Sequence, residues 1–196
     1  MSTTTRWTSR DLESLPDDGT RYEIIDGELF MSKQPHFYHQ DVCTELIGVL
    51  WNWDRTANLG RVAGAPGLIF AEDDDVAPDV VWISNDRLAA SLEADGKFHD
   101  APELVIEVLS PGSVNERRDR EAKLKLYSRR GVTEYWIVSW QARTVDVYRR
   151  QADELKLITI LTENDALQSP VLPGFSCPVS AIFARIPVNK QGEPKT

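Results

Sequence analysis

The sequence predicts an α/β domain, with α+β as the alternative, in which a mixed central β-sheet lies between helices. Two longer segments read as helices among several short strand-like runs. The run "ELVIEVLS" at 103–110 has apolar neighbours on both faces, as in a strand that is covered on both sides. Asp26-Gly27 between two strand-like runs predicts an N-terminal β-hairpin. We expect residues 1–186 to form one such domain and residues 187–196 to be a disordered tail.

The first predicted elements are a short helix, the hairpin and a long helix. Residues 8–15 suit a short helix that Thr8 or Ser9 caps. The hairpin lies within residues 20–32. The long helix is expected over 36–57, because this segment carries apolar residues at helical spacing, at Val42, Leu46, Val49, Leu50 and Trp53.

The middle of the chain predicts three strands and one loop. Glycine and proline residues break the chain before a strand at 68–73. A second strand is expected within 77–84, and the third is the apolar run at 103–110. The residues between them, 84–101, are polar and irregular in pattern, so we expect a mobile loop there.

The last third begins with a helix and continues as strands. The helix is expected over 115–130, because Gly131 is a good C-terminal stop. Three strand-like runs with short turns follow at 133–140, 144–150 and 155–161. Residues 172–183 suit a turn and a short helix.

The charge distribution is uneven along the chain. The net charge of −9 argues against a protein that coats nucleic acid, because phosphate binding favours Lys and Arg. Residues 115–130 nevertheless carry seven basic and three acidic side chains, whereas residues 72–79 carry five acids and no base. The basic segment suits either a local contact with phosphate or a solvated helix face.

Other features of the composition indicate a cytoplasmic protein. No apolar run reaches the roughly 18 residues that a membrane-spanning helix needs. The first sixteen residues lack the apolar core of a secretory signal. Cys43 and Cys177 show no metal-ligand spacing, so we expect buried free thiols and no disulfide.

Three acidic residues interrupt apolar strand-like runs: Glu23, Asp79 and Glu107. A buried charge is costly unless it is paired or binds a cation. Each acid alone has a structural explanation: Glu107 could pair with Arg118, Asp79 could cap the turn after Pro78, and Glu23 could pair with Arg21. Together they suggest a site for a hard cation, because Mg²⁺ prefers oxygen ligands.

A cation is also expected near these acids, and Lys123 on the predicted helix is the candidate. Asp119 and Lys123 are four residues apart, as are Lys123 and Tyr127, so the three share one helix face. The same spacing is found in ordinary surface ion pairs. Spacing alone leaves both interpretations open.

These residues resemble a known family. Pro78-Asp79, followed 28 residues later by an acid in a strand, is similar to the PD-(D/E)XK nuclease signature. The lysine that usually follows the second acid by two residues is absent, because Leu109 stands there. The whole arrangement resembles the Uma-two family of restriction-endonuclease-like proteins. The resembling stretches are "YEIIDGEL", "PHFYHQDVCTEL", "APDVVWI", "PELVIEVLSPGS", "DREAKLKLY", "GVTEYWIV" and "LPGFSCPVSAIF".

The resemblance implies a restriction-endonuclease-like core that is often dimeric, and a Mg²⁺- or Mn²⁺-dependent endonuclease that acts on nucleic acid, with DNA expected. It implies Asp79 and Glu107 as metal ligands and Glu23 as an additional acid. Lys123 matches a catalytic lysine displaced onto the following helix. Asp119, Tyr127 and His39 are accessory candidates, and His39 is expected either near the metal or at the helix end. The segment's arginines are expected to bind backbone phosphates, at Arg117, Arg118 and Arg120.

Three other readings stay open. A nuclease fold without turnover would serve as an interaction or nucleic-acid-binding module. A dimeric structural protein would use exposed aromatic residues as its interface, at Trp51, Trp53 and Trp140. A metal-dependent phosphatase would use the same ions on a smaller substrate.

Overall fold

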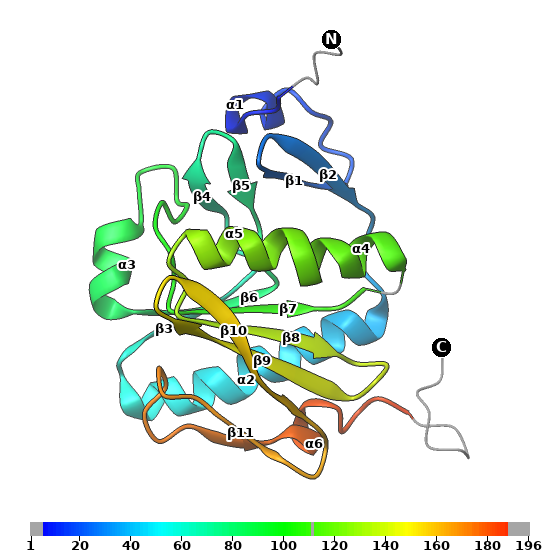
Figure 1. Ribbon diagram of the computed structural model, residues 1–196, viewed down its shortest axis with the longest axis vertical. Helices are drawn as coiled ribbons and strands as arrows, with labels where there is room; N and C mark the ends of the chain where they lie inside the picture. The colour runs from blue at the N-terminus through cyan, green and yellow to red at the C-terminus, as the bar shows by residue number, and fades with distance from the viewer. Residues whose placement is uncertain (1–5, 111, 188–196) are drawn as a thin grey trace.

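The computed structural model describes residues 6–110 and 112–187, and its centre is a six-stranded mixed sheet (Figure 1). The strand order is β10-β9-β8-β7-β6-β3, and β7 and β8 are its one parallel pair among the described residues. The six strands are β3 (Gly60–Gly64), β6 (Val80–Ser84), β7 (Leu104–Val108), β8 (Glu134–Ser139), β9 (Thr144–Gln151) and β10 (Glu154–Leu161). The predicted mixed α/β architecture is thus confirmed.

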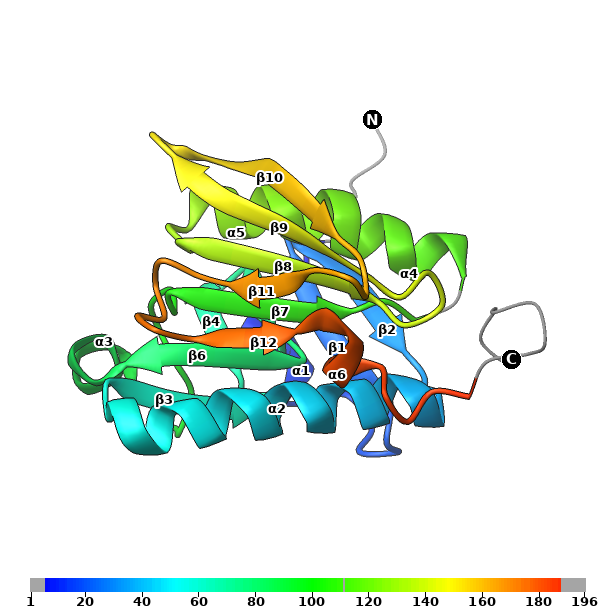
Figure 2. The same ribbon diagram turned by 90° about the horizontal axis from the view of Figure 1, so that it is seen from below.

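Helices cover both faces of this sheet (Figure 2). α2 (Phe37–Ala57) lies along one face, with the side chain of His36 accepting a hydrogen bond from the Tyr38 backbone N–H at its start. The other face carries a continuous helical segment in three parts: α4 (Ser113–Arg117), a π-helix η1 (Arg118–Lys123) and α5 (Leu124–Arg129). The strand β7 between them is buried at every position, as its apolar pattern predicted.

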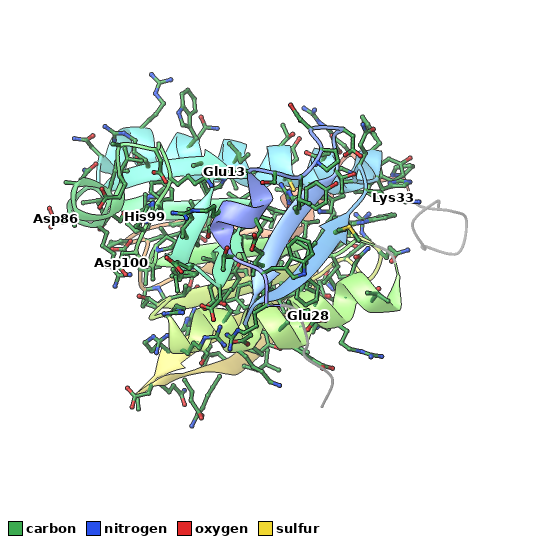
Figure 3. All side chains as sticks on the ribbon, turned by 90° about the horizontal axis from the view of Figure 1, so that it is seen from above. Glu13, Glu28, Lys33, Asp86, His99 and Asp100 are labelled. Atoms are coloured by element: carbon green, nitrogen blue, oxygen red, sulfur yellow. The ribbon has the colours of Figure 1, made fainter. Side chains whose placement is uncertain are left out.

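A second, four-stranded sheet stands beside the first, in the order β2-β1-β5-β4. Its hairpin joins β1 (Arg21–Ile25) to β2 (Glu28–Ser32) through Asp26 and Gly27, whose φ angles of 54° and 75° suit this turn. Figure 3 shows the hairpin from above, with Glu28 at its turn and Lys33 at its far end. The other members are β4 (Leu68–Ala71) and β5 (Asp74–Val76), and α1 (Ser9–Leu12) lies nearby with Thr8 as its N-cap.

The C-terminal part adds a two-stranded sheet, β11 (Ala166–Gln168) with β12 (Ser176–Pro178), and the short helix α6 (Val179–Ile182). These elements pack with α2 around one core that includes Leu46, Trp136 and Phe183. A second core, which includes Ile137, Leu126 and Tyr127, lies on the side of α5. Both cysteines are buried and free, as predicted.

Several expectations need correction. The segment 84–101 is not simply irregular, because α3 (Asn85–Ser91) begins at Ser84, whose side chain accepts a hydrogen bond from the Arg87 backbone N–H. The strands β3, β5, β11 and β12 were missed, since each is short and depends on its partner strand. Trp140 is only 1% exposed, so it cannot contribute to an exposed aromatic interface.

Two expectations concern the C-terminal tail and membrane-spanning helices. The predicted disorder of the tail concerns residues that, from 188 onward, lie outside the described part of the chain. Within the described ranges, no helix has the length and apolar character required to traverse a bilayer.

Candidate active site

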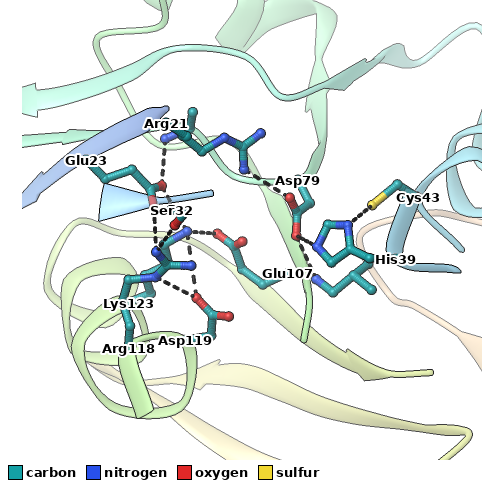
Figure 4. A network of polar contacts seen from close by, with 12 residues as sticks. Arg21, Glu23, Ser32, His39, Cys43, Asp79, Glu107, Arg118, Asp119 and Lys123 are labelled. Carbon is teal, nitrogen blue, oxygen red and sulfur yellow. Dashed lines mark hydrogen bonds and ion pairs between the residues drawn. The ribbon is translucent and has the colours of Figure 1, made fainter. Parts of the chain in front are cut away.

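The predicted acids converge where β1, β6 and β7 approach η1 (Figure 4). Glu23 lies in β1, Asp79 directly precedes β6, Glu107 lies in β7 and Asp119 lies in η1. All four carboxylates are buried. Asp79, Glu107 and Asp119 line a cavity of about 310 Å³, together with basic and polar side chains that include Arg21, His39 and Arg118.

Lys123 is at the centre of the charge cluster and is completely buried. Its Nζ lies 2.9 Å from Glu107 Oε1, 2.9 Å from Glu23 Oε1 and 3.8 Å from Asp119 Oδ1. The Tyr127 hydroxyl donates a second hydrogen bond, of 2.8 Å, to Glu107 Oε1. The predicted shared face of Asp119, Lys123 and Tyr127 is therefore present, and it points into the protein.

The π-helix explains how two cations reach the same acid. Arg118 Nη1 lies 3.5 Å from Glu23 Oε2, while Lys123 binds the other oxygen of Glu23. Residues five apart point in different directions in an α-helix, which has 3.6 residues per turn. The i→i+5 pattern of a π-helix brings them onto one face. η1 therefore directs Arg118 and Lys123 at Glu23.

Asp79 is held by donors on both of its oxygens. Arg21 donates to Oδ1 at 3.1 Å, and the Val108 backbone N–H donates to Oδ2 at 2.9 Å. His39 Nε2 lies 3.2 Å from the same Oδ2. Although burial opposes ionisation, the hydrogen bond from His39 and the nearby positive charges hold the pKa of Asp79 well below its usual range. Asp79 is therefore an ionised, fixed carboxylate.

The pKa of Glu107 shifts in the opposite direction from that of Asp79. Burial raises its pKa to about 8, and the charges of Asp79, Asp119 and Glu23 add to the rise against the opposing effect of Lys123. The cluster thus holds more acid than its own cations neutralise. In addition, Glu23 Oε2 is buried and accepts no hydrogen bond, although Arg118 lies 3.5 Å from it. Excess carboxylates at a cavity match the oxygen ligands that a divalent hard cation requires, so these residues fit such an ion.

The three arginines predicted to bind phosphate differ in their surroundings. Arg118 is largely buried beside the cluster, where it hydrogen-bonds to Ser32 and Asp119 and forms a 3.5 Å ion pair with Glu23. Arg120 pairs with Asp146 on β9. Arg117 is exposed. The structure therefore brings only Arg118 to the cavity.

The local pairings expected for single acids are not the ones observed. Arg21 pairs with Asp79 and not with Glu23. Glu107 pairs with Lys123 and not with Arg118, the partner considered from the sequence. His36 caps α2, so His39 is the histidine beside the acids. Sequence reasoning considered Arg21 only as a partner of Glu23 and missed its place at the cavity, although its spacing of two from Glu23 in a strand places both on one face.

Comparison with known proteins supports the fold. The family model Uma2, described as "Putative restriction endonuclease", matches residues 9–180. A solved structure from Anabaena variabilis, titled as a "putative nuclease belonging to DUF820", has 19% identity and a TM-score of 0.73. The match covers 90% of this chain and 97% of that one. The type IIG restriction endonuclease BpuSI matches at 16% identity and a TM-score of 0.40, over 76% of this chain and 15% of that one. No curated protein matches.

Proposed function

This chain belongs to the Uma2 family, and from that premise we propose that it is a metal-dependent nuclease that hydrolyses phosphodiester bonds, with DNA as the expected substrate. One observation carries the proposal. Asp79, directly before β6, and Glu107, in the neighbouring strand β7, meet at one cavity, and the buried cation Lys123 is bonded to Glu107.

The ion expected here is Mg²⁺ or Mn²⁺, which Asp79, Glu107 and a backbone carbonyl beside Glu107 would hold. When bound, such an ion polarises a phosphoryl oxygen and lowers the pKa of water. Glu23 is buried and is not among the residues that line the cavity. It pairs with Lys123 and accepts a hydrogen bond from the Ala77 backbone N–H. We propose that Glu23 supports the ligands through Lys123.

Lys123 acts as a fixed charge in this proposal. Despite burial, the carboxylates of Glu107, Glu23 and Asp119 raise the pKa of Lys123, so it keeps its proton at neutral pH. A protonated lysine cannot accept a proton from water. Its proposed roles are to orient Glu107 and to place a positive charge near the reacting phosphate.

Two guanidinium groups are suited to substrate binding at the cavity. Arg21 and Arg118 both line it, and the Arg21 side chain is one third exposed. Guanidinium groups bind phosphate through paired hydrogen bonds. We propose that these two arginines position the scissile phosphate, which assigns no base preference.

The direct test is a nuclease assay with the Asp79→Asn and Glu107→Gln variants. Plasmid, linear duplex, single-stranded DNA and RNA are offered with Mg²⁺ or Mn²⁺. We expect hydrolysis by the unmodified protein and a loss of about a hundredfold or more in each variant, a size typical for removing a group that organises the transition state. Glu134→Gln is the matched control, because Glu134 is a buried strand glutamate remote from the cavity lining. Full activity of Glu107→Gln would remove Glu107 from the mechanism.

One observation favours an alternative, a binding module without turnover. Leu109 is buried where the usual motif has a lysine, and the displaced Lys123 is fully engaged by carboxylates. Such a module would bind Mn²⁺ and nucleic acid without cleaving any substrate of the panel. The homodimer expected from the family resemblance stays a prediction, as does the cytoplasmic location.

A further inference from the structure

A second group of possible metal ligands lies behind Asp79, on the side of α2. His39 and Cys43 are four residues apart on this helix, and Cys43 Sγ lies 3.7 Å from His39 Nδ1. His39 Nε2 faces Asp79 Oδ2 at 3.2 Å. One ligand atom from each of the three residues lies within 4.8 Å of the other two, and all three residues are buried (Figure 4).

The chemistry of these three groups differs from that of the carboxylate cluster. A thiolate and an imidazole suit Zn²⁺ and related ions, whereas Mg²⁺ takes oxygen ligands. Tetrahedral bonds of about 2.0–2.3 Å place ligand atoms roughly 3.3–3.8 Å apart. The Sγ–Nδ1 separation of 3.7 Å already lies in this range. Asp79 faces the opposite ring nitrogen, Nε2. The His39 ring or the Asp79 carboxylate must therefore turn before one nitrogen, the thiolate and the carboxylate surround one ion. Because His39 and Asp79 also line the cavity, a fourth ligand such as water can enter from it.

We propose that His39, Cys43 and Asp79 form a binding site for a zinc-type transition-metal ion, with its fourth position open to the cavity. The ligand set is electrically balanced, because one thiolate and one carboxylate neutralise the two charges of the ion. Arg21, which bonds to the other oxygen of Asp79, can stay in place.

Binding at this site includes the loss of one proton. Burial raises the pKa of the Cys43 thiol, so the free protein holds it as S–H. The ion forms the S–metal bond as the S–H bond breaks, and the proton leaves to solvent. An ion with high affinity for thiolate can drive this exchange, and a hard ion such as Mg²⁺ cannot.

The site has a consequence that rests on the proposed function. Asp79 would be a ligand of both the zinc-type site and the Mg²⁺ or Mn²⁺ site. When its carboxylate turns toward Cys43 to bind zinc, it can no longer bind the other ion together with Glu107. Zinc would then act as an inhibitor that competes with the activating ion.

The first test is a titration with Co²⁺, which replaces Zn²⁺ and reports its ligands by absorption. We expect a thiolate-to-cobalt charge-transfer band in the near ultraviolet for the unmodified protein. Cys43→Ser should lose the band, and Cys177→Ser should keep it, since Cys177 is a buried free thiol on another element. His39→Gln should weaken Co²⁺ binding at least about tenfold. Absence of the band from the unmodified protein, or its persistence in Cys43→Ser, would overturn the proposal.

A competition experiment separates this site from the proposed nuclease site. Mn²⁺ is titrated calorimetrically in the presence and absence of one equivalent of Zn²⁺. Zinc should suppress Mn²⁺ binding more strongly in the unmodified protein than in Cys43→Ser, where zinc can compete only at the carboxylates. Equal suppression in both proteins would show that zinc displaces Mn²⁺ without Cys43 and would overturn the proposed inhibition. If Mn²⁺ never binds, the proposed function fails, whereas the cobalt band still decides the zinc-type site.

Discussion

Two buried glutamates on adjacent parallel strands show how differently one protein can use the same side chain. Glu107 lies near the end of β7, and Glu134 begins β8. Both are almost completely buried, and burial raises the pKa of both. They stand at opposite ends of the strand pair, because Glu134 is in register with Leu104, and Glu107 with Ile137.

Their partners differ. Each oxygen of Glu134 accepts one hydrogen bond, from Trp136 Nε1 at 2.6 Å and from Arg149 Nε at 2.9 Å. Glu107 instead directs one oxygen, Oε1, at two donors, Lys123 and Tyr127. It also shares Lys123 with two other carboxylates and faces a cavity.

The difference teaches what distinguishes a buried carboxylate with a purely structural partner from one in a candidate site. Burial and a raised pKa are common to both, so neither identifies a site. Glu134 has a cation of its own, whereas Glu107 competes for one with its neighbours. Competition among acids at an accessible cavity leaves negative charge that an incoming cation can neutralise.

The largest expected effect comes from removing the shared cation. Lys123→Met should lower the free energy of unfolding at pH 7 by about 3–5 kcal/mol, because it leaves buried carboxylates without their partner. Arg149→Met should cost less, about 1–3 kcal/mol, since the Arg149 side chain is one third exposed and Trp136 still bonds to Glu134. Urea denaturation of both variants measures the difference. Equal losses would break the comparison, because they would mean that Glu107 and Glu134 depend on their cations alike.

A pH series sharpens the comparison. The pKa of Glu107 rises from 4.5 to about 8 in the folded protein, so between these values the folded state keeps a proton that the unfolded state has lost. Stability of the metal-free protein should therefore fall as pH rises through this window, by up to about 1.4 kcal/mol per pH unit. Glu107→Gln should remove this decline, because glutamine resembles the protonated acid and does not titrate. Denaturation in the presence of a chelator at pH 5, 6.5 and 8 measures it, and parallel profiles of the two proteins would contradict the assigned pKa.

Much of the fold could be predicted from local patterns. The buried run of β7, the helical spacing of α2 and the Asp-Gly hairpin turn all reflect constraints that act within a few residues. α3 was missed although Ser84 is a good N-cap, because its polar composition resembles that of a loop. β3 contains glycine at both ends and owes its form to pairing with β6.

The site could be predicted in its membership but not in its pairings. Glu23, Asp79 and Glu107 were found because charges in apolar runs are conspicuous. Lys123 was found because a cation is expected near such acids and because the family resemblance implies a lysine there. No residue pattern signals η1, and its contacts of Arg118 and Lys123 with Glu23 join residues about 100 positions apart in the chain, which local patterns do not reveal. The group of His39, Cys43 and Asp79 was missed for the same reason, since the aspartate reaches the helix only through folding.

The smallest expected effects concern the arginines, and they extend the comparison to positive charges. Arg120 has its own partner, the buried Asp146, as Glu134 has Arg149. Arg117 is exposed and its charge is available to solvent. Arg117→Ala should therefore weaken nucleic-acid binding a few-fold and reduce the salt dependence by about one phosphate contact, with stability changed by less than about 0.5 kcal/mol.

Arg120→Ala should do the reverse, with a loss of about 1 kcal/mol in stability and a smaller effect on binding. Fluorescence anisotropy with a labelled duplex at two salt concentrations measures binding, and urea denaturation measures stability. The opposite ranking in binding would show that a paired arginine leaves its carboxylate for a phosphate. The rule drawn from the two glutamates would then hold only for pairs in which both partners are buried, because the Arg120 side chain is 38% exposed and can exchange its partner.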